Sequence, residues 1–180
     1  FYADIGKDDR LRPFFGPWGT QSSRNAPPAK RFPPAMSRWL RCIIGKPGTS
    51  IVGVDWSSQE FALAAILSGD EEMAEAYRSG DPYRYFAQRA GAIPTKGVEV
   101  AWIKDPSKAP KEQQEKYQGY ADTRKLFKAT VLGLQYGMGV DSLAKKLSAD
   151  MGRKVSTSEA DNLIELHKHT FETFWWWRKT

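Results

Sequence analysis

Beyond residue 55, apolar positions recur mainly at the spacing of helices. The segment 59–67 is apolar almost all round, which predicts a buried helix with Ser57 and Ser58 as candidate caps. Asp70 and Asp81 are both typical of a helix N-cap, so we expect a second helix after Asp70 and a third after Asp81. A proline directly after Asp81 supports the third start, because proline is favoured in the first helical turn.

The middle of the chain predicts a loop and then a long helix. Three prolines indicate a loop or insertion over 92–110. A long helix is expected over about 111–132, with Gly119 as a candidate break, and a short one over 140–149.

The last predicted helix starts at Ser156, because Ser156 and Glu159 match a capping box. Three consecutive tryptophans, 175–177, cannot all face one core, so at least one is expected at the surface. The apolar face of this helix, which we expect in the core, runs Ala160, Leu163, Ile164, His167, Phe171, Phe174 and Trp175.

The first part of the chain is different in composition. Residues 1–48 are dense in proline and glycine, which excludes long helices there. Their many arginines and lysines form either a solvated basic region or an arm that lies on phosphates. Residues 50–55 have the β-branched pattern of a short buried strand. The expected fold is therefore α+β and mostly helical.

Composition narrows the classes of partner. A net charge of +6 over 180 residues favours a polyanionic partner. One cysteine argues against a disulfide framework, and together with only two histidines it argues against a structural zinc site. The longest apolar run, 61–67, is too short to cross a bilayer, so no membrane partner is expected.

Asp55 ends the predicted strand and precedes the first predicted helix. A carboxylate held there by rigid backbone suits a Mg²⁺ ligand, and the backbone amides of residues 57–59 would add donors for an anion. The alternative is that Asp55 is simply a helix cap, and the local sequence favours neither interpretation.

A second candidate constellation lies in the long predicted helix. At 100° per residue, Arg124 and Lys128 share one helical face with Val131, Leu132 and Gln135. A guanidinium fork and an ammonium point charge suit a triphosphate, and the apolar shelf beyond them suits a base. The alternative, which such a pattern more often represents, is a solvated basic stripe on a surface helix.

Together and in this order, the two segments resemble motifs A and B of family A DNA polymerases, the bacterial DNA polymerase I group and its phage relatives. The family's motif A reads Asp-Tyr-Ser-Gln-Ile-Glu, and residues 55–60 read Asp-Trp-Ser-Ser-Gln-Glu. Residues 67–70 repeat the family's Leu-Ser-Gly-Asp. Motif B is an arginine, a lysine four residues on, and then a Tyr-Gly pair, which here are Arg124, Lys128, Tyr136 and Gly137.

The resemblance implies a DNA-directed DNA polymerase that transfers a nucleotide from a dNTP to a primer 3′-hydroxyl with two Mg²⁺ ions. Asp55 and the carbonyl of Trp56 would bind metal, and Glu60 would exclude a ribose 2′-hydroxyl. Catalytic roles would fall to Asp55, Arg124 and Lys128. Residues implied to contact the nucleotide are Ser57, Ser58, Gln59, Glu60, Arg124, Lys128, Leu132 and Tyr136. Those implied to contact primer-template DNA are Arg24, Tyr136 and Gly137.

The resemblance also implies how the chain divides into subdomains, and several positions differ from the family's pattern. Residues 1–69 would be a palm segment with motif A, and residues 70–180 the fingers with motif B. Leu132 stands where the family usually has an aromatic residue, and Tyr83 where a phosphate-contacting histidine is common, with Arg84 as a candidate substitute. No motif C follows motif B, so we expect the palm and thumb segments of a parent polymerase as partners and no activity of this chain alone.

Two other functions stay open. A single-subunit RNA polymerase has a similar motif B, but Glu60 argues against it, because that class lacks a carboxylate under the sugar. A non-catalytic DNA-binding protein that accompanies replication would reuse the fold without motif C. The polymerase interpretation places the protein in the cytoplasm of a bacterium or of a phage-infected cell.

Overall fold

The computed structural model describes residues 6–8, 14–20, 25–26, 48–50, 52 and 54–179. The chain divides into two compact units, Phe1–Asp55 and Trp56–Thr180. The predicted boundary after residue 69 is a division between the palm and fingers of a polymerase, and it stays a prediction.

In the first unit, the described residues form a single backbone bridge. Gly16 and Ala26 each donate their N–H to the other's carbonyl oxygen at 3.0 Å. The strand predicted over 50–55 is not formed at its described positions, and Val52 and Val54 are exposed instead of buried. A strand needs a neighbour for its N–H and C=O groups, and the described residues offer none here. The α+β expectation is thus borne out only in its helical part.

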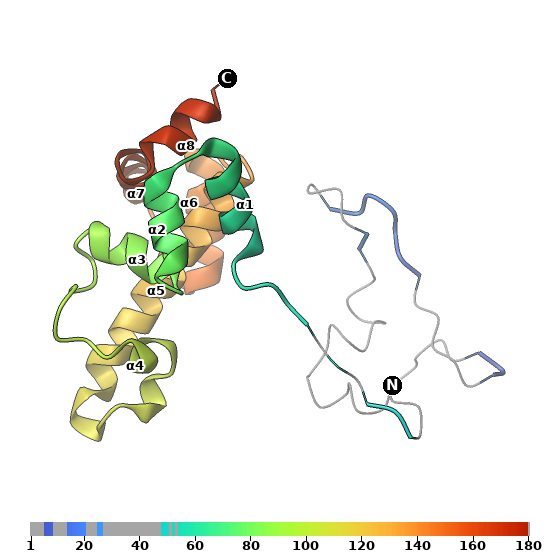
Figure 1. The fold of residues 1–180 in the computed structure, drawn as a ribbon, viewed down its shortest axis with the longest axis horizontal. Helices are drawn as coiled ribbons and strands as arrows, with labels where there is room; N and C mark the ends of the chain where they lie inside the picture. The colour runs from blue at the N-terminus through green and yellow to red at the C-terminus, as the bar shows by residue number, and fades with distance from the viewer. Residues whose placement is uncertain are drawn as a thin grey trace. The chain divides into compact units, whose positions relative to one another are not determined.

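The second unit is helical, and its described residues contain no strand (Figure 1). The long helix α5 contacts α1, α3, α4, α6 and α7, so it is the element around which the others pack. The helices are α1 Gln59–Ser68, α2 Glu71–Arg78, α3 Pro82–Arg89, α4 Val100–Lys104, α5 Gln114–Gln135, α6 Val140–Met151, α7 Thr157–Thr170 and α8 Glu172–Trp177, with short 3₁₀ turns η3 Pro106–Lys108 and η4 Lys111–Gln113.

Helices α2 and α3 begin with the caps that the sequence predicts. The buried Asp70 accepts the N–H of Met73 at 2.9 Å, and the buried Asp81 accepts the N–H of Arg84 at 3.2 Å. At α1 the cap differs, because Ser58 has a φ of 50° and makes no side-chain hydrogen bond to the helix. The capping role expected of Ser58 is therefore wrong, since its hydroxyl is used elsewhere, as described below.

Three departures from the predicted helices have a physical reason. Helix α4 forms inside the predicted loop over 92–110, where Trp102 packs edge-on against Tyr117 of α5 with ring centroids 5.2 Å apart. Helix α5 continues through Gly119, since an exposed glycine costs a helix only about 1 kcal/mol. The last predicted helix is divided into α7 and α8 at Phe171, whose ring is buried in the core.

The core gathers aromatic rings from α1, α3 and α5 and from the residue between α7 and α8. Phe86 of α3 packs on Phe127 of α5 with ring centroids 4.8 Å apart. Phe171, which follows α7, packs on Phe61 of α1 at 5.7 Å. The edge-to-face contact of Phe127 places one side of α5 against the core, so the opposite side stays accessible.

The start and end of the last predicted helix behave as expected. Ser156 caps α7 by accepting the N–H of Glu159 at 3.0 Å, while the Glu159 carboxylate pairs with Arg153 at 2.6 Å. Trp176 is 68% exposed and Trp177 38%, so the expected surface tryptophan is confirmed.

His167 is the buried polar side chain among these rings. Its Nδ1 accepts the indole N–H of Trp175 at 2.8 Å, so the neutral ring carries its proton on Nε2. Nε2 has no hydrogen-bond partner in the described part of the chain, and the rings of Phe86 and Phe171 lie 5.2 and 4.9 Å from the imidazole. Burial, and to a lesser degree the positive charge of Arg178, lowers the pKa of His167 to about 3.

We expect His167 to make the fold less stable in mild acid. Its pKa in the folded chain, about 3, lies below the ordinary 6.5, so the unfolded chain binds the extra proton and stability is lost as the pH falls between these values. The free energy of unfolding should drop by roughly 2 kcal/mol from about pH 7 to about pH 5. Urea titrations followed by circular dichroism measure this change.

A matched pair of variants isolates the effect. His167→Gln should remove most of this pH dependence, whereas His169→Gln, at an exposed position of α7, should keep it. The same slope in wild type and in His167→Gln would contradict the prediction.

Candidate functional site

Arg124 and Lys128 lie one turn apart on α5 and share the ring of Tyr83 on α3. The guanidinium carbon of Arg124 lies 5.8 Å from the ring centroid, and Lys128 Nζ lies 5.6 Å from it. Cations at this distance are attracted by the quadrupole of the ring. The common face predicted for the two cations is therefore present, and Tyr83 is the surface that both contact.

A buried carboxylate fixes Arg124. Asp81 Oδ2 accepts from Arg124 Nε at 2.6 Å, while Oδ1 of the same carboxylate caps α3. The side chain of Asp81 is 1% exposed and that of Arg124 25%, so water screens this ion pair little. Because Asp81 is itself held at the start of α3, the guanidinium is held in one orientation on α5.

Tyr83 also connects the two cations to the start of α1. Burial raises the pKa of the Tyr83 hydroxyl, a hydrogen bond with Ser58 lowers it, and the negative charge of Glu60 raises it. The positive charge of Arg124 acts on the same hydroxyl and lowers its pKa. The first turn of α1 and the cations of α5 therefore meet at Tyr83, although the sequence places them more than 60 residues apart.

A second contact joins α1 to the end of α5. The hydroxyl of Tyr136 donates to Oε1 of Glu60 at 3.3 Å. Tyr136 directly follows the last residue of α5, and Gly137 then turns the chain with a φ of 82°, a conformation that favours glycine. Two residues predicted to bind the nucleotide, one from α1 and one from the end of α5, are thus in direct contact.

Beyond the cations, a groove of about 570 Å³ lies between α5 and α6. Lys128, Leu132 and Tyr136, all predicted nucleotide contacts, line it. Val131 was expected on the same apolar shelf, but it is fully buried because it lies on the core-facing side of α5. The residues that line the groove are Lys125, Lys128, Ala129, Leu132, Gly133, Tyr136, Met138, Lys146 and Asp150.

The remaining predicted residues lie outside this cluster or outside the described chain. Asp55 belongs to the first unit and is exposed, and Trp56, the first residue of the second unit, is 74% exposed. Ser57 and Gln59 are exposed at the start of α1. Arg24 lies outside the described residues. The structure therefore brings together six of the predicted site residues, which are Ser58, Glu60, Arg124, Lys128, Leu132 and Tyr136.

Asp55 is the predicted metal ligand. Among the described residues, no group of three or more His, Cys, Asp or Glu side chains could hold a metal ion. Mg²⁺ is commonly bound by one or two carboxylates together with substrate phosphates. A single exposed carboxylate fits one part of such a set, so Asp55 suits a magnesium site that is shared with other ligands.

Sequence reasoning misses the partners that hold Arg124. Asp81 is recognisable as a helix cap, but its ion pair joins residues 43 positions apart, and no local pattern indicates it. Arg84, the candidate substitute for a phosphate-binding histidine, donates instead to Gln88 at 2.6 Å within its own helix. Tyr83, at the histidine position itself, is the residue of this pair that faces the cations.

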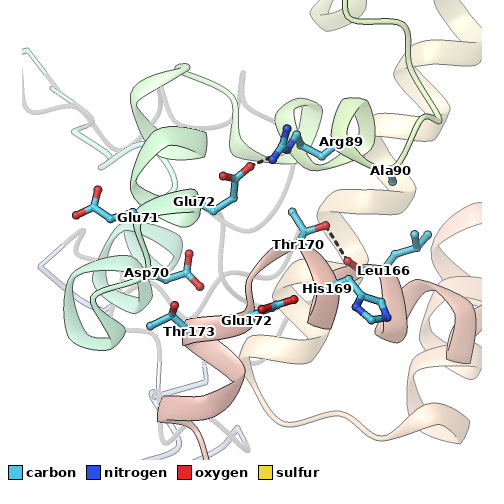
Figure 2. A pocket seen from close by; sticks show the side chains of 10 residues that line it. All are labelled: Asp70, Glu71, Glu72, Arg89, Ala90, Leu166, His169, Thr170, Glu172 and Thr173. Atoms are coloured by element: carbon cyan, nitrogen blue, oxygen red, sulfur yellow. Dashed lines mark hydrogen bonds and ion pairs between the residues drawn. The ribbon is translucent and has the colours of Figure 1, made fainter.

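A second cavity, of about 500 Å³, lies between α2, α3, α7 and α8 (Figure 2). Its wall is acidic, but Glu72 is paired with Arg89 at 2.7 Å and accepts the Tyr85 hydroxyl at 2.9 Å. No predicted site residue lines this cavity, so it is separate from the groove on α5. The lining residues are Asp70, Glu71, Glu72, Arg89, Ala90, Leu166, His169, Thr170, Glu172 and Thr173.

The chain is similar to DNA polymerases. It is 29% identical over 162 residues to the DNA polymerase of Mycobacterium phage L5, which covers 81% of this chain and 25% of that protein. It is 30% identical over 86 residues to the polymerase of Mycobacterium phage D29, covering 46% of this chain and 14% of that protein. With DNA polymerase I of Mycobacterium tuberculosis H37Rv the identity is 26% over 126 residues, 69% of this chain and 11% of that protein. No protein-family profile and no solved structure matches the chain significantly.

These similarities confirm the resemblance that motifs A and B predict: the chain is DNA polymerase I-like. The alignment with the phage L5 polymerase covers 81% of this chain. The chain spans 25% of the length of that relative, so the activity of the whole relative is a proposal for this protein. None of the described helices has both the length and the apolar character to span a membrane.

We expect the Asp81–Arg124 pair to stabilise the folded chain by about 1–3 kcal/mol in a double-mutant cycle. Asp81→Asn keeps an acceptor for the N–H of Arg84, and Arg124→Met keeps an apolar stem, so the cycle isolates the charged contact. Urea titrations of the four chains give the coupling. The exposed pair Lys168–Glu165 is the control and should couple by less than about 0.5 kcal/mol. Equal coupling in the two pairs would contradict the prediction.

Proposed function

We propose that this chain is the nucleotide-binding part of a DNA-directed DNA polymerase of the DNA polymerase I type. The observation that carries the proposal is the arrangement on α5, where two cations over Tyr83 lead into an apolar groove. The similarity to phage and bacterial DNA polymerases supports the same function. The complete polymerase would transfer a nucleotide from a dNTP to a primer 3′-hydroxyl, and this chain would bind the dNTP.

In this proposal Arg124 and Lys128 bind the triphosphate. Arg124 uses Nε for Asp81, which leaves its two Nη groups as the donors directed to phosphate oxygens. Lys128 is exposed on the next turn and adds a mobile point charge. The two cations neutralise negative charge that grows on the phosphates as pyrophosphate leaves, which is how such pairs act in phosphoryl transfer.

The sugar and base occupy the far end of the site. Leu132 and Tyr136 line the groove and would flank the nascent base pair, and Ser57, Ser58 and Gln59 would lie near the nucleotide at the start of α1. Glu60, held by Tyr136, would occupy the space that a ribose 2′-hydroxyl needs. Such an arrangement would favour deoxynucleotides without a dedicated hydrogen bond to the sugar.

Metal and DNA contacts complete the proposal. Asp55 and the carbonyl of Trp56 would hold Mg²⁺ together with substrate phosphates, and the ions would activate the primer hydroxyl and stabilise the leaving group. Arg24, Tyr136 and Gly137 would contact the primer-template. The palm and thumb of a complete polymerase would supply the second carboxylate for a two-metal site.

Removal of either cation should weaken nucleotide binding. Lys128→Ala and Arg124→Ala should each raise the Kd of the chain for Mg²⁺-dTTP by about tenfold or more, because a charge-assisted contact contributes roughly 1.5–3 kcal/mol. Ligand-observed NMR titrations of the 180-residue chain measure the Kd, and circular dichroism verifies that each variant is folded.

Lys145→Ala is the charge-matched control. Lys145 is an exposed residue of α6 that does not line the groove, so its loss should change the Kd less than about twofold. If Lys128→Ala and Arg124→Ala bind dTTP as well as this control does, the assignment of the cations is wrong.

Glu60→Ala should reduce the preference for deoxynucleotides. The ratio of the Kd values for ATP and dATP should fall by roughly tenfold, because the carboxylate no longer excludes the 2′-hydroxyl. Glu172→Ala, which removes an exposed carboxylate from α8, should leave the ratio unchanged. A wild-type chain that binds ATP and dATP equally would favour the single-subunit RNA polymerase alternative.

A further inference from the structure

The residue that follows α8 contacts the C-terminal end of α5. Arg178 donates from Nη1 to the carbonyl oxygen of Leu134 at 3.0 Å. The same guanidinium lies beside Gly137, since a Cβ added to that glycine would meet Arg178 Nη2 at 3.4 Å. Arg178 therefore binds the backbone before Tyr136 and lies beside the residue that follows it.

The backbone that carries Tyr136 is a glycine-dependent helix ending. The N–H of Gly137 donates to the carbonyl of Leu134, and the N–H of Met138 donates to that of Gly133, each at 3.0 Å. This pair of bonds is the Schellman arrangement, which uses carbonyls that the helix itself leaves unpaired. The Leu134 carbonyl thus accepts two donors, one from the turn and one from Arg178.

Arg178 is itself held by a chain of contacts that ends at a buried histidine. Its guanidinium carbon lies 4.9 Å from the ring centroid of Trp175, and the Trp175 indole N–H is bound by the buried His167 at 2.8 Å. At the start of α8, the N–H of Phe174 donates to Oδ2 of Asp70 at 2.9 Å. Helix α8 is therefore held near its start by Asp70 and along one side by the contacts of Trp175. Arg178, which follows this helix, reaches α5 from that position.

We propose that Arg178 is a positioning residue for Tyr136 and sets the orientation in which Tyr136 meets a nucleobase. The inference rests on the proposed function, in which Tyr136 flanks the nascent base pair. Arg178 does not line the groove, so it acts through the backbone of residues 134–137. Loss of Arg178 consequently impairs recognition of the base and spares recognition of the triphosphate, which Arg124 and Lys128 bind on earlier turns of α5.

Two probes separate these contributions in the 180-residue chain. In Arg178→Ala, the Kd for dTTP should rise about fivefold, whereas the Kd for inorganic tripolyphosphate should change less than about twofold. Lys179→Ala removes the same charge from the neighbouring residue and should change both constants less than about twofold. Arg178→Lys, which keeps a charged donor, should recover part of the lost dTTP affinity.

A double variant tests the route through Tyr136. In a Tyr136→Ala chain, the further change Arg178→Ala should cause no additional loss of dTTP affinity, because coupled residues are not additive. Independent, additive losses would overturn the inference. So would an equal loss of dTTP and tripolyphosphate binding in Arg178→Ala, which indicates a general effect on the fold.

Hydrogen exchange separates a failure of this inference from a failure of the proposed function. If the wild-type chain binds neither dTTP nor tripolyphosphate, the proposed function is wrong. The amides of Gly137 and Met138 should still exchange several times faster in Arg178→Ala than in Lys179→Ala, because the helix ending loses a support. Equal exchange in the two variants would overturn the positioning role itself.

Discussion

Two buried aspartates hold the helical unit together by dividing their oxygens between a near and a distant partner. Asp70 caps α2 with Oδ1 and binds the Phe174 N–H of α8 with Oδ2. Asp81 caps α3 with Oδ1 and binds Arg124 of α5 with Oδ2. A buried carboxylate is costly unless its oxygens are satisfied. The positions of α8 and of Arg124 therefore depend on the starts of two other helices.

Both constraints act on α5. Asp81 holds the helix at Arg124, and Asp70 acts on its far end through α8 and the bond from Arg178 to Leu134. The proposed nucleotide contacts Lys128 and Leu132 lie between these two points, on a helix that is restrained at both of them. A site on a rigid element, supported at both ends, keeps its side chains near the orientation that a ligand needs.

The sequence predicts what is local and misses what is distant. The caps at Asp70 and Asp81 follow from residue type and position, and the common face of Arg124 and Lys128 follows from helical period. Their distant partners do not, because Asp70 and Phe174 are 104 residues apart and no pattern connects them. Periodicity also cannot decide how wide the buried face of a helix is, which is why Val131, expected beside Leu132 in the groove, lies in the core.

The charges of the site indicate that it would bind a triphosphate through donors that are already in position, more than through a net positive charge. Arg124 and Lys128 face two carboxylates, those of Asp81 and Glu60, around one tyrosine ring. A site that relied on charge alone would leave out both acids. Here the acids hold one cation, Arg124, and one hydroxyl, that of Tyr136, in place, so a bound triphosphate would meet an Arg124 whose side-chain freedom is already largely lost. Under the proposed function, the side chain of Arg124 loses its conformational entropy when the chain folds and not when the nucleotide binds. Selectivity between nucleotides then comes from the positions of Glu60 and Tyr136.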